Sequence, residues 1–401
     1  MVAMRKKLVP VLIAGSIIIS ACAQFPTPGA LIKPPGTGAS TAAGRKAGNQ
    51  NELLKIVQTF LPAGAHLLAP EPAGEVAQST RELIQTGDLN HDGQPEIIAG
   101  YRTSQGSAGV LVLEEIKNGK WAKLWQEEGG YSLERLQLAD ITGDGRDELL
   151  IGWAIGASAG NGLDILAWQD GNLKKIAGTG YHRLEVEDLA GEKGKDGRQE
   201  LAVWVKDTGD AMAVDVLRWD GKNLISAEDV YLAYFPRVVE YYRKRVREHP
   251  QASFYWYYLA DALVKVREYR QALEAAEKGM VADKVIYPSI YGFQLIKARA
   301  LTGLERYHEA TAIYQDIIAA GEKKLPHPQK PASMGSAIRS LLTADLSPRM
   351  MGEACYEAGE IYARLGQNQR AAEYFQKALI YLPGWDKPRK ALEELASKET
   401  K

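Results

Sequence analysis

Hydrophobic and polar residues follow three different patterns along this chain of 401 residues. Near the N-terminus, residues 8–20 form a single apolar run, LVPVLIAGSIIIS. From about residue 76 to residue 232, short apolar or alternating segments such as EIIAGYR and VLVLEEI are typical of β-strands. After about residue 235, apolar positions recur every three or four residues, which predicts amphipathic helices. The pattern therefore predicts a multidomain chain with an all-β part followed by an all-α part.

The first apolar run has the layout of a targeting segment. Arg5, Lys6 and Lys7 precede it, and it is too short to cross a bilayer comfortably. It ends in ISAC, which resembles the lipobox of bacterial lipoproteins. That resemblance implies that residues 1–21 are a cleaved signal peptide and that Cys22 is lipidated, which would anchor the chain to a bacterial membrane outside the cytoplasm. The alternatives are an ordinary signal peptide with an incidental cysteine, or an uncleaved anchor.

Two connecting segments precede the predicted strands. Residues 22–50 are rich in Pro, Gly, Ala, Ser and Thr, which predicts a flexible tether. Residues 51–75 carry the apolar stretch LLKIVQTFLPAGAHLLAP, which we expect to cover part of the domain that follows.

Three acidic stretches recur at a fixed interval in the predicted β region. GDLNHDGQPEIIAG, ADITGDGRDELLIGW and EDLAGEKGKDGRQELAVWV place Asp-Gly pairs at residues 92, 144 and 196, so the interval is 52 residues both times. KNGKW, QDGNL and WDGKN follow in step, and such pairs between apolar runs favour tight hairpins. Each unit therefore predicts four antiparallel strands.

These units resemble the integrin-type repeats called FG-GAP or VCBS, which form propeller blades. Over residues 76–232 the resemblance implies a propeller-like domain of three four-stranded blades. Closed propellers usually have four to eight blades. The sequence leaves open whether three blades form an open arc capped by the helices, gain cover from residues 53–70, or complete a ring with a second chain.

The acidic loops are candidate calcium sites because Ca²⁺ prefers oxygen ligands. An EF-hand is excluded, because its twelfth position would be Ala99 and strand-like residues follow the loop. The resemblance implies ligands at loop positions 1, 3, 5 and 9 and a carbonyl at position 7. The candidates are Asp88, Asn90, Asp92, Gln94 and Glu96 in the first loop, Asp140, Thr142, Asp144 and Glu148 in the second, and Asp188, Asp196 and Glu200 in the third.

The third loop departs from this pattern, because four extra residues, GEKG, break its spacing. We expect calcium to be structural, with the third loop the weakest candidate. The alternative is that the Asp and Asn side chains only close turns by bonding to their own backbone.

The helical region, residues 236–396, resembles three tetratricopeptide repeats. In each copy two small residues lie 12 positions apart, at 260 and 272, 298 and 310, and 359 and 371, which lets two antiparallel helices approach closely. The resemblance implies a helical solenoid with a groove for a protein or peptide. In the first copy the implied groove residues are Tyr257, Asp261 and Lys265, although FYWYY could equally be core. Cys355 occupies the tryptophan position of the repeat signature and is expected to be a buried thiol.

Composition narrows the function further. Lys plus Arg total 49 and Asp plus Glu total 50 without a basic block, so nucleic acid is not an expected partner. The histidines lack zinc-site spacing, and no P-loop is present. The letters G-x-S-x-G occur in GASAGNG at residues 156–162, but this stretch lies where the first unit has SQGSAG, so we expect an inter-strand loop and predict no catalytic residue. We therefore expect a scaffold that binds a protein or peptide partner in the cell envelope. The alternatives are a surface receptor for glycans or other ligands and an envelope hydrolase with an unrecognised site.

Overall fold

The computed structural model describes residues 50–71, 82–117, 119–156, 159–284, 286–324 and 346–399. From Asn51 onward the chain forms one compact unit. The predicted signal peptide, Cys22 and nearly all of the predicted tether lie outside the described residues. Among the described helices, none is both long and apolar enough to span a membrane.

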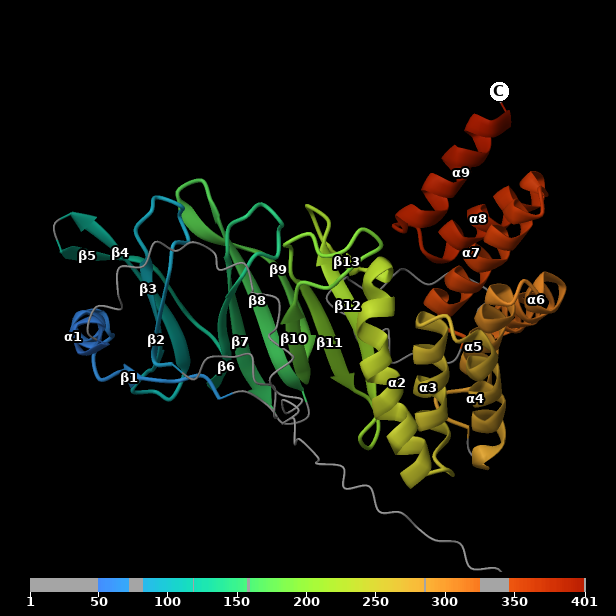
Figure 1. Cartoon of the computed structure of the whole chain (residues 1–401), viewed down its shortest axis with the longest axis horizontal. Helices are drawn as coiled ribbons and strands as arrows, with labels where there is room; N and C mark the ends of the chain where they lie inside the picture. Colours follow the sequence, from blue (N-terminus) through green and yellow to red (C-terminus); the bar gives the residue numbers. More distant parts are fainter. Residues whose placement is uncertain are drawn as a thin grey trace, which may run out of the picture. The chain divides into compact units, whose positions relative to one another are not determined.

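The β region consists of three antiparallel sheets that follow one another in sequence (Figure 1). In the second and third sheets each strand pairs with the next along the chain. The first sheet contains β1 (His66–Leu67), β2 (Ile84–Gly87), β3 (Glu96–Arg102), β4 (Ala108–Lys117) and β5 (Lys120–Glu128). The second contains β6 (Ser132–Ala139), β7 (Glu148–Gly156), β8 (Gly160–Gln169) and β9 (Asn172–Tyr181). The third contains β10 (Arg183–Glu187), β11 (Glu200–Lys206), β12 (Met212–Trp219) and β13 (Leu224–Ser226).

The second and third sheets match the predicted unit of four antiparallel strands. The first sheet differs at one edge, where β2 pairs with Glu96–Ala99 of β3 and β1 pairs with Tyr101 and Arg102. In the described residues none of the sheets closes on itself. The propeller-like arrangement implied by the family resemblance is therefore not confirmed.

Turn chemistry explains why the strands end where they do. In the hairpin between β8 and β9, Asp170 and Gly171 have φ angles of 52° and 78°. A two-residue hairpin needs two such left-handed residues to match the twist of its strands, which is why Asp-Gly favours it. The glycine in each acidic loop is also left-handed, with φ of 84°, 82° and 88° at Gly93, Gly145 and Gly197.

Apolar side chains fill the spaces between successive sheets. Ile98 of β3 and Ile151 of β7 belong to one buried cluster, which joins the first and second sheets. Ile165 of β8 and Val203 of β11 belong to another, which joins the second and third sheets. Burial of these side chains is the main favourable contribution to folding of such a stack.

Helices cover the two remaining sheet faces. Val57 of α1 (Gln50–Phe60) is buried in a cluster with Tyr101 of the first sheet. Beyond the third sheet, Trp204 shares a large core with Tyr234 of α2 (Tyr231–Glu248), which lies beside β12 (Figure 1). In this chain the third sheet is thus covered by helices where a further sheet would otherwise pack.

The helical region confirms the predicted change of period. The short helix η2 (Glu228–Val230) precedes α2. Helical hairpins follow, formed by α3 (Ser253–Lys265) with α4 (Tyr269–Ala282), α5 (Ile290–Gly303) with α6 (Tyr307–Lys324), and α7 (Pro348–Arg364) with α8 (Asn368–Tyr381). Helix α9 (Asp386–Glu399) packs on α8.

Small residues bring the two helices of each hairpin together, as predicted. Ala260 and Ala272 are fully buried, and so are Ala298 and Ala310. In the last hairpin a Cβ on Gly359 would lie 2.6 Å from the ring of Phe375, so only glycine fits there without movement. Cys355 is fully buried, as predicted, and burial raises the pKa of its thiol to about 12.

Candidate functional site

The first acidic loop is closed by hydrogen bonds between its own backbone and side chains. The Asp88 carboxylate accepts from the backbone N–H of Asp92 at 3.1 Å and of Gly93 at 3.0 Å. The Asn90 side chain accepts from the N–H of Asp92 at 2.9 Å, and Asp92 accepts from the N–H of Gln94 at 2.8 Å. These bonds stabilise the turn whether or not an ion is bound.

A buried glutamate ends each acidic loop and begins the next strand. Glu96, Glu148 and Glu200 are 1%, 3% and 1% exposed. Each accepts a hydrogen bond from the backbone N–H of the second loop residue, at 2.7 Å from Leu89, 2.8 Å from Ile141 and 2.9 Å from Leu189. The glutamate therefore fastens the start of the loop to the strand that leaves it.

Burial makes these glutamates unusual acids. It raises the pKa of Glu96 and of Glu148 to about 7, and the neighbouring Asp88 and Asp140 carboxylates add to the effect. It also raises the pKa of Glu200, against the opposing effect of the Leu189 N–H and of Arg218. In the second loop the Thr142 hydroxyl donates to Glu148 at 3.2 Å.

The three loops differ in how their charges are balanced. In the first two loops the carboxylates make no ion pair within the described residues; they are Asp88, Asp92, Glu96, Asp140, Asp144 and Glu148. In the third loop Asp196 pairs with Arg198 at 3.1 Å and Glu200 pairs with Arg218 at 2.8 Å. Asp188 keeps one buried carboxylate oxygen without a hydrogen-bond partner.

The donor chemistry of the first two loops suits calcium, because it consists of hard oxygens with unbalanced negative charge. Within the parts of the chain that the structure describes, no three His, Cys, Asp or Glu side chains are gathered around a point that could hold an ion. These loops therefore carry suitable ligands without a preformed coordination shell. In the third loop, by contrast, Asp196 and Glu200 are already paired with arginines, and the GEKG insertion forms its own small turn through Gly191 and Gly194.

The predicted groove residues of the first repeat contact other parts of this chain. Lys265 Nζ lies 2.9 Å from Asp261, donates to the Val214 carbonyl of β12 at 3.1 Å, and lies 4.4 Å from the ring centroid of Phe235. The half-buried Tyr257 meets the ring of Phe293 edge-on at 5.4 Å. Lys265 thus contributes to the junction between α3 and the third sheet.

A polar cluster joins α5, α6 and α7 and was not predicted. Arg299 donates to Glu357 and to Glu353, both at 2.8 Å. Tyr314 donates to Glu357 at 2.8 Å, and Arg349 donates to Glu353 at 2.7 Å. An alignment of the three copies on their small residues at 260, 298 and 359 places a charged residue directly after each one. These residues are Asp261, Arg299 and Glu360, so the alignment would have indicated Arg299 as a position of interest.

A hydrogen bond from a side chain to a backbone carbonyl joins each sheet to the next. Gln85 of β2 donates to the Leu136 carbonyl of β6 at 2.9 Å, which links the first sheet to the second. Arg135 donates to the Leu184 carbonyl at 2.9 Å, which repeats the link between the second and third sheets. Arg237 of α2 then pairs with Glu187 of β10 at 2.9 Å. This ion pair ties helix α2 to the third sheet.

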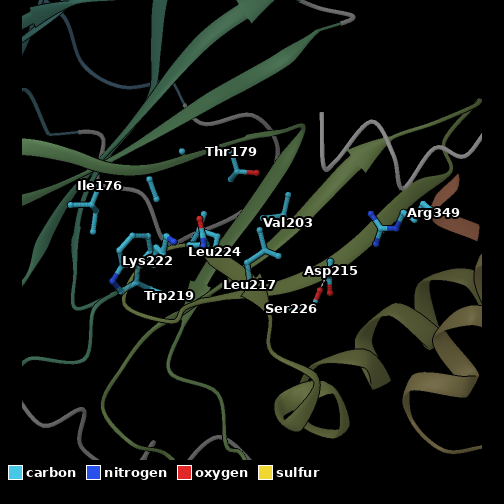
Figure 2. Close-up of a pocket in the computed structure, with 13 residues that line it drawn as sticks. Ile176, Thr179, Val203, Asp215, Leu217, Trp219, Lys222, Leu224, Ser226 and Arg349 are labelled. Carbon is cyan, nitrogen blue, oxygen red and sulfur yellow. Dashed lines mark hydrogen bonds between the residues drawn. The ribbon is translucent and has the colours of Figure 1, made fainter. Parts of the chain in front are cut away.

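An open pocket of about 360 Å³ lies between β9 and strands β12 and β13 (Figure 2). Half-buried apolar side chains form its floor, among them Ile176, Leu217 and Trp219. The acid in its lining, Asp215, accepts from the Ser226 hydroxyl at 2.6 Å. The Tyr231 hydroxyl also donates to Asp215 at 2.6 Å, so this carboxylate is occupied by internal bonds.

A family model described as tetratricopeptide repeat matches residues 352–385. The match begins in α7, includes α8 and ends just before α9. It supports the tetratricopeptide resemblance for the last of the three copies. No curated protein matches the chain.

Proposed function

We propose that this chain is a membrane-anchored scaffold outside the cytoplasm that binds a protein partner through its helical array. The observation that carries the proposal is the tetratricopeptide match to α7 and α8, because such repeats generally mediate binding of protein partners. The proposal assigns no catalytic role to the chain.

The last repeat offers the better binding surface. In the first repeat Asp261 and Lys265 pair with each other, and Lys265 also binds β12. In the last repeat Glu360 occupies the place of Asp261, and Tyr356, one helical turn earlier, contacts Trp385 with ring centroids 4.9 Å apart. Paired aromatic side chains beside an acid suit a peptide that carries apolar and basic residues.

Under this proposal the three sheets connect the helical array to the membrane anchor. The signal-peptide layout and the lipobox-like ISAC support a lipid anchor at Cys22, in a chain that emerges outside the cytoplasm. The 52-residue recurrence and the four-stranded units support a kinship with integrin-type repeats. Under this proposal Asp88, Asn90, Asp92 and Glu96, and their second-loop counterparts, would hold calcium, whose charge would offset their mutual repulsion.

Cross-linked purification of the full lipidated chain from its own cells tests the proposal. We expect one or more envelope proteins to be recovered well above a mock purification. Recovery of no protein, from intact cells and with the helical region folded, would contradict the scaffold function.

The pocket between β9 and β12 favours a second candidate, a receptor for a small ligand. Its volume of about 360 Å³ falls in the range of ligand sites, and Trp219 could stack on a sugar or an apolar ring. A thermal-shift screen of simple sugars against the full chain would test this. Stabilisation by a sugar that is lost in Trp219→Ala would support the receptor, and the absence of any shift would reject it.

A further inference from the structure

The side chain of Arg218 joins two carboxylates at the third acidic loop. Its guanidinium donates to Glu200 at 2.8 Å and to the two carboxylate oxygens of Asp229 at 2.9 and 3.0 Å. The Arg218 side chain is 17% exposed and that of Glu200 is fully buried. Asp229 belongs to η2, which leads into α2, so the contact reaches from the loop to the start of the helical region.

At the equivalent strand position of the other two described sheets there is no arginine. In the third sheet Leu201 pairs with Leu217, which places Glu200 beside Arg218. In the second sheet Leu149 pairs with Leu166, so Ala167 lies beside Glu148. In the first sheet the same register places Glu114 beside Glu96, because Ile97 pairs with Leu113. The equivalent position thus holds glutamate, alanine and arginine in turn.

We propose that Arg218 replaces the metal ion at the third loop, so that this loop is stable without calcium while the first two loops depend on it. A buried carboxylate needs a compensating positive charge, and the Arg218 guanidinium supplies it to Glu200 through a charge-assisted hydrogen bond from Nε. Asp196 is likewise paired, with Arg198, and Asp188 alone cannot form a calcium shell. The second half of the proposal rests on the calcium binding proposed above for the first two loops.

The consequence concerns the helical array. The third sheet is the one that shares a buried core with α2 and α3. If Arg218 stabilises the third acidic loop, loss of calcium loosens the first two sheets. The third sheet, on which the helical array packs, then stays intact. The sensitivity to calcium would then be confined to the part of the chain nearer the N-terminus.

Hydrogen exchange of the full chain, with calcium and with a chelator, tests where calcium acts. We expect calcium to slow exchange in residues 88–99 and 140–151 by about ten-fold or more, and to leave residues 188–203 unchanged. Titration calorimetry should show that two calcium ions bind per chain. Calcium protection of the third loop equal to that of the other two would overturn the proposal.

The role of Arg218 is tested in chelator, so its result does not depend on calcium. Arg218→Met should speed exchange at residues 188–203 and at the start of α2 by about ten-fold. Lys222→Met is the matched control, because Lys222 lies exposed on the next hairpin, and it should change nothing. Adding Glu200→Gln to Arg218→Met should restore slow exchange, because the buried charge is then removed.

The outcomes separate the two proposals. If wild-type chain binds no calcium but Arg218→Met still opens the third loop, the role of Arg218 stands and the calcium part of the proposed function fails. If Arg218→Met exchanges like wild type, Arg218 does not hold this loop and the inference is wrong.

Discussion

The indole N–H of Trp204 donates a 2.7 Å hydrogen bond to the phenol oxygen of Tyr234. Trp204 belongs to β11 and Tyr234 to α2, and their exposed fractions are 2% and 0%. The third sheet and the first helices therefore share a polar contact inside a common apolar core. Because the two elements bury each other, we expect them to unfold together.

Tyr234→Phe tests this junction. The variant leaves the Trp204 N–H buried without an acceptor, so the free energy of unfolding should fall by about 1–3 kcal/mol. Denaturant unfolding, followed both by tryptophan fluorescence and by helical circular dichroism, measures it. Tyr241→Phe is the control, because its hydroxyl bonds to the Asp210 carbonyl at an exposed site and its loss should matter less. Equal losses in the two variants would contradict the prediction.

Gly359→Ala should destabilise the last repeat. A Cβ at this position would lie 2.6 Å from the buried ring of Phe375, and such overpacking costs about 1–3 kcal/mol. The cost should exceed the gain of up to about 1 kcal/mol that alanine brings to a helix. Gly384→Ala has no atom within 4 Å of its added Cβ and should be close to neutral in the same thermal melts. A neutral Gly359→Ala would show that the two helices do not pack as described.

The buried loop glutamates predict that the β region is more stable in mild acid. Burial raises the folded-state pKa of Glu148 to about 7 from its ordinary 4.5, so the folded chain binds more protons than the unfolded chain between these values. In chelator, stability should therefore rise as the pH falls from 8 to about 5. Glu148→Gln should reduce this dependence by about 1–3 kcal/mol, measured by denaturant unfolding across the range. An unchanged slope would mean that Glu148 is not titrating in the folded chain.

Arg299→Met should weaken the contact between the second and third helical hairpins. It leaves Glu353 and Glu357 on α7 without their shared arginine, and the loss should be about 1–3 kcal/mol after allowing for partial exposure. Arg306→Met removes an exposed pair with Glu309 and should have no measurable effect. Chemical denaturation measures the free energy of unfolding of both variants. Equal losses would show that the Arg299 ion pairs contribute no more to stability than an exposed surface pair.

Short-range sequence patterns predict many of the hairpins in this fold. The Asp-Gly pair at residues 170 and 171 predicts its hairpin because the turn itself requires left-handed residues there. The 12-residue spacing of small residues predicts the helical hairpins because it marks where two helices cross. Both features are fixed by residues close together in the sequence.

Contacts between residues far apart in the sequence do not follow from local patterns. Arg135 would be expected on the surface, yet it is 1% exposed and bonds to a carbonyl 49 residues away. The same holds for the ion pair between Arg237 and Glu187, and for the fact that α2 rather than another sheet covers the third sheet. The hydrogen bond from Lys265, a predicted groove residue, to β12 also arises because the third sheet packs against the first repeat. Such contacts depend on which sheets and helices pack against each other, and local patterns in a single sequence do not reveal this.

The most direct test of the scaffold function is the affinity of a recovered partner for variants of the last repeat. Glu360→Lys on α7 should weaken binding to the full chain about ten-fold or more, because it reverses the charge beside Tyr356, whose ring contacts Trp385. Glu373→Lys, an exposed charge reversal on α8, should leave the affinity unchanged. Equal affinities for wild type, Glu360→Lys and Glu373→Lys would contradict the claim that the tetratricopeptide array is the binding surface.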